Sequence, residues 1–440
     1  MKILLIGSGA REHAIARALK KSPRLSRLYV TLNAAHPGLM ALAHEYNMGD
    51  VCDIPQVVTA AKHWGVDFVI VGPEAPLAQG IADALREACI PVIGPTQKLA
   101  RLEGSKAFTR RLMEKYRISG LPRYQIFHDL HGSEAWLNEL GEQHYVIKAD
   151  GLMGGKGVKV AGDHLHSFTE AFAYCRSLSE AKQSFVIEEK LIGQEFSLMS
   201  FCDGQSVIPM PLVQDHKRAF VHDTGPNTGG MGSYSEPDHR LSFLSLKDIA
   251  EAQRINEAVL SAAQQECGEP YCGILYGSFI ATREGIAVIE FNCRFGDPEA
   301  MNVLGILQSD FVTVCCAMIE GNLRDTSISF AHQATVCKYI VPEGYPDHAI
   351  QHAVLDVSMI QNQDQLYLAS VAEKEGKLTM LGSRAAAVLG IGNTVAEAEN
   401  QAEAEVQRIQ GPVFHRADIG TDSLIASRRL QMEQLRGVTS

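Results

Sequence analysis

The first hundred residues alternate short apolar runs with segments of helical periodicity, and this alternation restricts the possible folds more than any other feature. The candidate strands are residues 2–6, 28–32, 67–71 and 91–93, and the candidate helices are 11–20 and 77–88. Such alternation is typical of a parallel, doubly wound sheet covered by helices. Glycine turns follow three of the strands, at Gly7, Gly72 and Gly94. Because ligands of these sheets bind beyond the carboxyl ends of the strands, we expect the turns to line a binding site.

The pattern changes after residue 105 to strands joined by hairpins and mixed with helices, which is typical of an α+β body. The candidate strands here are 144–148, 158–161, 184–188, 195–201, 207–211, 276–282 and 287–291, and the candidate helices are 106–115 and 167–177. Beyond residue 324 the pattern starts again with a strand at 334–341 and a helix at 395–410. A chain of 440 residues is too long for one core, so we predict three domains.

Composition excludes several classes of protein. The formal net charge of −11 argues against a nucleic-acid-binding surface, which requires a basic field. The sequence contains no run approaching ~20 apolar residues, so we expect no membrane span. Its ten cysteines are scattered, without metal-finger spacing or a secretory signal, which predicts reduced thiols in the cytoplasm. Cys315 and Cys316 lie in an apolar segment and are expected in the core.

A glycine-rich segment, Lys148-Ala-Asp-Gly-Leu-Met-Gly154-Gly155-Lys156-Gly157, joins two of the candidate strands. Glycines at a hairpin tip expose backbone N–H groups, and lysines add positive charge, so the segment suits a polyphosphate. It is not a Walker A loop, since Gly157 follows Lys156 where Ser or Thr is required. A flexible hairpin turn is the alternative interpretation.

Glu290 and Asn292 are two residues apart in a candidate strand, so their side chains share one face about 7 Å apart. Two hard oxygen ligands beside Arg294 are suited to Mg²⁺-bound phosphates. An edge strand with a solvated Glu and Asn is the alternative.

Three loops carry further candidate residues. The segment 214–218 (Gln-Asp-His-Lys-Arg) is followed at 223–232 by a run so rich in glycine that we predict an irregular loop around an anion or polar substrate. Residues 7–13 offer a helix N-terminus to a phosphate. They do not form a dinucleotide fingerprint, because Glu12 stands in place of its third glycine. His348 and His352 are spaced as a metal pair but have no third ligand nearby, so a solvated face is expected.

Together these segments resemble the glycinamide ribonucleotide synthetase family of ATP-grasp ligases. The resemblance extends over almost the whole chain, at GSGAREHA (7–14), VGPEAPL (71–77), GPT (94–96), EGSKAF (103–108), IKADGLMGGKGV (147–158), VIEEKL (186–191), QDHKRA (214–219), DTGPNTGGMGSYS (223–235), IEFNCRFGDPEA (289–300), GYP (344–346) and RADIG (416–420). It implies an ATP-grasp fold (105–325, with a mobile lid at about 118–192), preceded by the doubly wound α/β domain (1–104) and followed by a small mixed C-terminal domain (326–440).

The resemblance also implies the reaction and its residues. It implies that ATP and Mg²⁺ or Mn²⁺ drive the joining of glycine to 5-phosphoribosylamine through glycyl phosphate, in purine biosynthesis, by a cytoplasmic monomer or homodimer. The implied ATP-binding residues are Lys106, Lys148, Gly154, Gly155, Lys156, Glu188, Glu189, Leu191 and Glu195. The implied metal ligands are Glu290 and Asn292, and the implied catalytic residues are Lys156, Asp215, Lys217 and Arg294. The implied substrate contacts are Gly9, Arg11, Glu12, Pro73, Glu74, Asp223, Asn227, Gly229, Gly230 and Arg294.

The sequence departs from common bacterial members at several of these places. The turn at 32–38 reads Leu-Asn-Ala-Ala-His-Pro-Gly, Ala10 replaces a frequent Gly, and Ser278 stands where some relatives carry a Gln proposed as a metal ligand. Gly382-Ser383-Arg384 stands where Gly-Gly-Arg is common.

Three other functions would each account for part of the sequence. A nicotinamide dehydrogenase explains the first βαβ unit but not the candidate metal strand. A carboxyaminoimidazole or formate-dependent ribonucleotide enzyme would share the nucleotide site but lack the 214–218 and 223–232 motifs. An ATP-binding regulatory module would bind nucleotide without releasing ADP.

Overall fold

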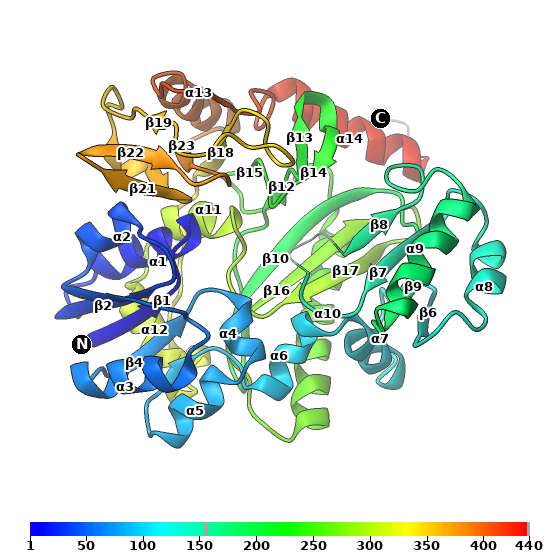
Figure 1. The fold of residues 1–440 in the computed structure, drawn as a ribbon, viewed down its shortest axis with the longest axis horizontal. Coiled ribbons are helices and arrows are strands. Elements are labelled where there is room, and N and C mark those ends of the chain that lie inside the picture. The colour runs from blue at the N-terminus through cyan, green and yellow to red at the C-terminus, as the bar shows by residue number, and fades with distance from the viewer. Residues whose placement is uncertain (154–156, 438–440) are drawn as a thin grey trace.

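A computed structural model describes residues 1–153 and 157–437 of the chain. Its N-terminal part is a parallel sheet with strand order β3-β2-β1-β4-β5, as the alternating pattern predicted (Figure 1). The strands are β1 (Lys2–Ile6), β2 (Arg27–Leu32), β3 (Glu45–Met48), β4 (Phe68–Val71) and β5 (Val92–Ile93). The helices are α1 (Ala10–Lys20), α2 (Pro37–Leu42), α3 (Ile54–Trp64), α4 (Glu74–Ala78), α5 (Ile81–Glu87) and α6 (Gln97–Gly104).

The prediction of a single helix over residues 77–88 is wrong. The structure has two short helices, α4 and α5, and the chain turns between them at Gly80, which has a φ of +89°. This left-handed conformation interrupts a helix and strongly favours glycine. The break lets α4 begin directly after the Gly72-Pro73 turn, so that Glu74 lies in its first turn.

The segment after α7 (Lys106–Lys115) forms the small unit at the right of Figure 1, which we call the lid. Its antiparallel sheet has the order β6-β9-β7-β8. Its elements are β6 (Tyr124–Phe127), α8 (Ser133–Leu140), β7 (Tyr145–Ala149), β8 (Val158–Val160), α9 (Phe168–Glu180) and β9 (Phe185–Glu189). The apolar side chains of the lid form a core of their own, separate from the main core of the molecule.

The central body is built on a second antiparallel sheet of order β11-β10-β16-β17. Its strands are β10 (Gln194–Asp203), β11 (Val207–Pro209), β16 (Cys272–Ala281) and β17 (Ile286–Asn292). The helices of the body are α10 (Leu246–Cys267), α11 (Glu299–Gly305) and α12 (Phe311–Glu320). Cys315 and Cys316 are buried in α12, as predicted.

The C-terminal part shares its main sheet with the middle of the chain. Strands β12 (Gln214–Asp215) and β15 (Gly232–Ser235) extend a sheet of order β12-β15-β18-β23-β20, so segments on both sides of residue 325 contribute to it. The later strands are β18 (Ala334–Pro342), β20 (Leu366–Leu368), β23 (Ala386–Gly392) and β24 (Val413–Phe414), with a smaller sheet of β19 (Val354–Leu355), β21 (Val371–Lys374) and β22 (Lys377–Met380). Helix α13 (Val395–Val406) packs on this sheet, and α14 (Asp422–Arg436) crosses to the central body.

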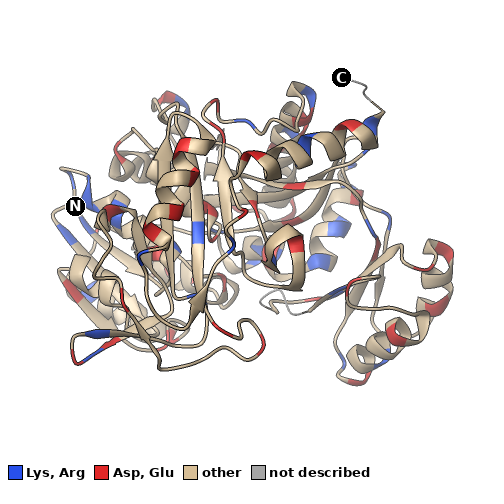
Figure 2. Cartoon of the chain, turned by 90° about the horizontal axis from the view of Figure 1, so that it is seen from above, with Lys and Arg blue, Asp and Glu red and all other residues tan. Residues whose placement is uncertain are grey.

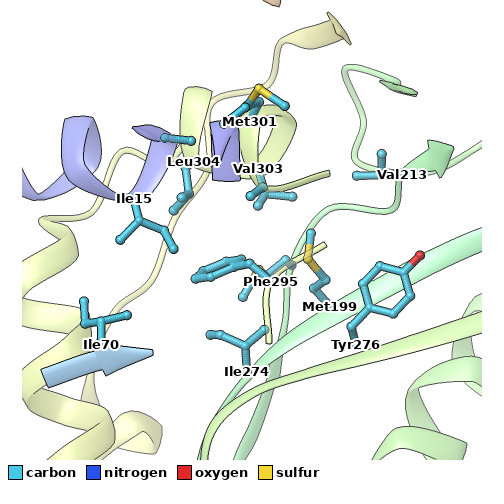
Figure 3. Close-up of a cluster of buried hydrophobic side chains, with 14 of the residues drawn as sticks. Ile15, Ile70, Met199, Val213, Ile274, Tyr276, Phe295, Met301, Val303 and Leu304 are labelled. Atoms are coloured by element: carbon cyan, nitrogen blue, oxygen red, sulfur yellow. The ribbon is translucent and has the colours of Figure 1, made fainter. Parts of the chain in front are cut away.

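One continuous core joins the N-terminal, central and C-terminal parts. Figure 3 shows Ile15 and Ile70 of the N-terminal part beside Phe295, with Met199 and Ile274 of the central strands on its other side. Figure 2 shows acidic and basic positions interspersed along the ribbon in the view from above, in a chain of net charge −11. Within residues 1–153 and 157–437, no helix is long and apolar enough to cross a membrane.

Two buried histidines join the N-terminal sheet to the C-terminal part. His13 Nδ1 accepts a hydrogen bond from the backbone N of Leu368 (3.0 Å), and His36 Nε2 donates to the carbonyl oxygen of the same residue (2.8 Å). Burial lowers the pKa of both rings, and the positive charge of Arg17 lowers that of His13 further. Both are therefore neutral at pH 7, and protonated His13 could not accept this bond.

We expect the stability of this junction to fall as the pH drops below about 6.5, the ordinary pKa of histidine. Below that value the unfolded chain binds protons that the folded chain excludes, so acid favours unfolding, while the full stability is present above it. Replacing His13 with Gln should reduce the loss of thermal midpoint between pH 7.5 and pH 5.5. His63→Gln, on the exposed side of α3, is the control. An equal loss in wild type and His13→Gln would contradict the assignment.

Candidate active site

A buried ion cluster lies where the lid meets the body. Glu188 of β9 accepts from Lys148 of β7 (Nζ to Oε2, 2.7 Å) and from Arg110 of α7 (Nε to Oε1, 2.6 Å). All three side chains are 7% exposed or less. Burial alone would raise the pKa of Glu188, but the two cations outweigh it and lower this pKa to about 2. Glu188 is therefore an anion that holds Lys148 in place where the lid meets the body.

A bulge in β17 adds an acceptor to this cluster. Ile289 is an extra residue opposite the step from Ser278 to Phe279, so it is left out of the regular pairing. Its carbonyl oxygen accepts from Arg110 Nη2 (2.7 Å) and from Lys148 Nζ (3.1 Å). The bulge thus fixes both cations against the strand that carries the two candidate metal ligands.

The glycine-rich segment begins beside the N-terminus of α7. Asp150 accepts from the Ser105 hydroxyl (3.1 Å) and from the backbone N of Ala107 (3.1 Å), and Lys106 Nζ donates to the carbonyl oxygen of Gly151 (2.9 Å). Lys106 and Lys148 are therefore placed at the two sides of this segment. The predicted contacts of Gly154, Gly155 and Lys156 lie outside the described residues.

Glu290 and Asn292 share one face of β17, as the alternation predicted. Ser278 pairs with Glu290 and Tyr276 pairs with Asn292 across β16, while Phe291 faces the other way and packs against Phe279. Burial alone would raise the pKa of Glu290. The surrounding cations outweigh burial and lower the pKa of Glu290; they are Lys217, Lys106, Lys148 and Arg294. Glu290 is thus a partly buried carboxylate with four cations near it.

Asp215 and Lys217 lie in the same region, at the end of β12. Lys217 Nζ is 3.2 Å from Glu195 Oε2, and this carboxylate raises the pKa of Lys217 even though burial opposes it. Burial and the nearby Glu299 raise the pKa of Asp215. Its Oδ1 atom is buried and has no hydrogen-bond partner among the described residues. A buried carboxyl oxygen without a partner is costly, and a cationic group of a substrate would satisfy it.

Arg294 bridges the central body and the N-terminal part. Its guanidinium lies 3.3 Å from Glu74 Oε2 and 2.9 Å from Glu103 Oε1, and it donates to Asn292 Oδ1 at 3.4 Å. The carboxylates of Glu103 and Glu74 raise the pKa of Arg294 against its burial. Arg294 therefore connects the turn after β4 with the strand that carries the two candidate metal ligands.

The loop after β1 is held by its own acidic residue. Glu12 is buried; its Oε2 accepts from the backbone N of Gly9 (2.6 Å) and its Oε1 from Arg11 Nε (2.5 Å). A Cβ atom at Gly72 would lie 2.2 Å from Glu12 Oε1, and one at Gly7 would lie 2.9 Å from Pro73 Cδ. The two glycine turns therefore close on each other around Glu12, as expected for turns at the carboxyl edge of one sheet.

The segment 223–232 is not wholly irregular, and that prediction is corrected. Residues 224–227 form β14 (Thr224–Asn227), which pairs with β13 (Arg218–Phe220) in a short hairpin. The strand is possible because both sides of the hairpin are largely exposed, so glycine loses no packing there. Asn227 is exposed and pairs with Arg218, while Gly229 and Gly230 follow the hairpin.

Asp223 lies at the tip of this hairpin and pairs with the C-terminal part. Its Oδ1 is 2.7 Å from Arg416 Nη1, and its Oδ2 contacts Arg428 of α14. Burial opposes ionisation, but these arginines lower the pKa of Asp223 to about 2. Both oxygens of this predicted substrate residue are thus engaged by the protein. Arg416 belongs to the RADIG motif, whose place in the sequence indicated no such partner.

Sequence reasoning missed three polar residues at these junctions, namely Glu103, Arg110 and Arg384. Arg110 follows Lys106 by four residues on α7. Helical spacing therefore predicts that Arg110 lies next to Lys106, one of the lysines implied to bind ATP. Glu103 accepts from the backbone N of Cys293 (2.7 Å), a partner 190 residues away. Such long-range contacts have no local sequence signal.

The residues present fit an ATP-bound divalent ion. Mg²⁺ commonly keeps several waters and takes only one or two protein carboxylates in addition to phosphates, so Glu290 with Asn292 is a sufficient donor set. The described part of the chain holds no cluster of three or more His, Cys, Asp or Glu side chains that would bind a metal by itself.

Comparison with known proteins assigns the family. Models of the N domain, the ATP-grasp (A) domain and the C domain of phosphoribosylglycinamide synthetase match residues 1–103, 104–300 and 335–422. Phosphoribosylamine–glycine ligases of Methanocella arvoryzae and Methanosarcina barkeri are 45% and 46% identical, over 99% of this chain and 100% of each relative.

The structural comparison gives the same fold. The crystal structure of phosphoribosylamine–glycine ligase from Thermotoga maritima has a TM-score of 0.79 at 26% identity and covers 95% of this chain and 100% of its own. The biotin carboxylase domain of a Hydrogenobacter thermophilus 2-oxoglutarate carboxylase, solved with MgADP, has a TM-score of 0.70 at 17% identity and covers 98% of this chain and 93% of its own. The chain therefore belongs to the phosphoribosylglycinamide synthetase family and has its three-part architecture with a central ATP-grasp fold.

Proposed function

We propose that this protein is an ATP-dependent ligase that joins glycine to 5-phosphoribosylamine in purine biosynthesis, releasing ADP and phosphate. One observation carries the site assignment: Glu290 and Asn292 lie on one strand face, and four cations of the cleft lower the pKa of Glu290. Such a site holds a metal–polyphosphate and leaves nearby Asp215 for the carboxylate and amine substrates.

The reaction requires an activated carboxylate, because oxide is a poor leaving group. The glycine carboxylate attacks the γ-phosphate of ATP, which gives glycyl phosphate and ADP. The amine of phosphoribosylamine then attacks the acyl carbon, loses a proton and displaces phosphate. When bound, Mg²⁺ or Mn²⁺ supplies charge neutralisation for the transferring phosphoryl group. Its ligands are Glu290 and Asn292.

The side chains of the cleft orient and neutralise the substrates. Lys106, Lys148, Lys156 and Lys217 offset the repulsion between a carboxylate and a polyphosphate. The backbone of residues 188–191 contacts adenine, and Glu195 binds ribose. Asp215 receives the ammonium group of glycine through its unpartnered oxygen, which leaves the glycine carboxylate free to point toward the nucleotide. The turns at Gly9 and Pro73 bind phosphoribosylamine.

The lid closes over this site during the reaction. Glycyl phosphate is hydrolysed readily, so the reaction needs a cavity from which water is excluded. The proposed lid, at about 118–192, has a separate apolar core. This core allows the lid to move as a body against the N-terminal domain (1–104), the rest of the ATP-grasp domain (105–325) and the C-terminal domain (326–440).

ADP release is the test of the function. We expect release with ATP and Mg²⁺ only when both glycine and freshly generated phosphoribosylamine are present, with glycinamide ribonucleotide detected by mass. Release with another carboxylate or amine would retain an ATP-grasp ligase but reject these substrates. ATP binding without release under any pairing would favour a regulatory module.

A further inference from the structure

We infer that Arg384 of the C-terminal part is the positioning residue for the substrate pocket proposed above, so this inference rests on that function. Arg384 lies between β22 and β23, and the peptide group that follows it is held by two backbone hydrogen bonds. Its carbonyl oxygen accepts from the backbone N of Ser370 (2.9 Å), and Ala385 N donates to the carbonyl oxygen of Ile340 (2.9 Å). The long side chain is therefore attached to a rigid sheet and reaches out of it toward the central body.

The guanidinium of Arg384 binds two segments of the body at once. Its Nη1 donates to the carbonyl oxygens of Gly229 (2.8 Å), Gly230 (3.1 Å) and Asp297 (3.2 Å), and its Nη2 lies 3.4 Å from Asp297 Oδ1. The Tyr339 ring covers one face of the guanidinium at 4.3 Å, and the Tyr339 hydroxyl donates to Asp297 Oδ1 at 2.5 Å. With Nη1 shared among three carbonyls and one face covered, Arg384 acts through these segments instead of binding substrate itself.

The segments that Arg384 holds lie beside Asp215 and the loop after β1, two of the proposed substrate contacts. Gly230 has a φ of +113°, and a Cβ atom there would lie 2.7 Å from the unpartnered Oδ1 of Asp215. On the other side, a Cβ atom at Gly9 would lie 3.8 Å from Asp297 Oδ2. Arg384 thus sets the distance of the glycine turn from Asp215, and of Asp297 from the loop after β1. Among the described residues, it touches none of those assigned to ATP.

This arrangement makes a selective prediction. Arg384→Ala should lower kcat/KM for glycine and for phosphoribosylamine by about 10²-fold, the usual effect of misplacing a substrate by about 1 Å, while the Kd of MgATP stays within about twofold. Arg384→Lys should recover only part of the activity, because a lysine is a point charge without the planar fork. Tyr339→Phe, which removes one bond to Asp297 and keeps the ring, should give a smaller loss in the same two parameters.

The experiment compares wild type, Arg384→Ala, Arg384→Lys and Tyr339→Phe with Arg429→Lys, an exposed arginine of α14, as the control. Steady-state ADP release is measured against each of the three substrates, together with MgATP affinity and thermal midpoint. Losses confined to glycine and phosphoribosylamine support the inference. Arg384→Ala within about threefold of wild type would overturn it, as would a parallel loss of MgATP affinity and thermal midpoint. Wild-type protein that releases no ADP with glycine and phosphoribosylamine would instead reject the proposed function, and this inference with it.

Discussion

Glu290→Ala is expected to lower kcat for ADP release by roughly 10³-fold, which corresponds to about 4 kcal/mol of transition-state stabilisation. The carboxylate of Glu290 is the only anionic ligand that we assign to the ATP-bound metal, and the pKa lowered by its surrounding cations keeps it charged. Without it, Asn292 alone would have to hold the ion, and the phosphoryl transfer would lose its charge compensation. Glu290→Gln should behave similarly, since an amide oxygen cannot replace the charge.

The measurement for Glu290 separates chemistry from folding. ADP release and Mg²⁺ dependence are compared with the midpoint of urea unfolding for wild type, Glu290→Ala and Glu290→Gln. The control is Glu284→Ala, an exposed glutamate in the turn before β17, which should retain wild-type activity. Folded Glu290 variants that release ADP at the wild-type rate would reject the metal assignment.

A second expected result is that chelation of Mg²⁺ stops ADP release by wild-type protein, and that added Mg²⁺ restores it.

The elements best predicted from sequence are those whose signal is local. The strands β1 and β2 and the helix α7 lie within about one residue of their predicted limits, because apolar runs and helix periodicity define them. Helices α3 and α10 were not predicted, although both carry end signals. Asp53 caps α3, with Pro55 in its first turn and Gly65 after its end, and Ser245 with Asp248 forms a capping box at the start of α10. These helices were detectable from their caps.

The site could be predicted in its parts but not in its assembly. The shared face of Glu290 and Asn292 follows from strand alternation alone, and the structure agrees with it. The contact of Arg110 with the Ile289 carbonyl and that of Arg384 with Gly230 join segments 154 or more residues apart, so no spacing rule reports them. The sharing of one sheet by β12, β15 and the C-terminal strands is equally non-local. Each of these contacts depends on packing between elements that are far apart in the sequence, and a local sequence pattern gives no sign of it.

The predicted roles of charged residues illustrate the same limit. The family resemblance assigned Asp223 and Glu12 to substrate, and the structure engages both with arginines or backbone donors. A loop sequence shows that a carboxylate is available, whereas its partner is decided by the fold. Predictions from sequence are therefore strongest where both partners lie within one element.

Glu188→Gln is expected to destabilise the junction between lid and body by about 3–5 kcal/mol, because it leaves Arg110 and Lys148 buried without their anion. The side chain keeps its shape, so the loss is one of charge.

The same carboxylate should contribute to acid unfolding of wild type. Its pKa is about 2 in the folded protein and near 4.3 in the unfolded chain, so its contribution is present above about pH 4.3 and is lost as the pH falls toward 2. Urea unfolding together with hydrogen exchange of β7 and β9 measures the effect. The control is Glu139→Gln, whose partner Arg123 is 53% exposed, and there we expect a change below about 1 kcal/mol. If Glu188→Gln were no more destabilising than this surface variant, the buried cluster would not be what fixes Lys148 in the cleft.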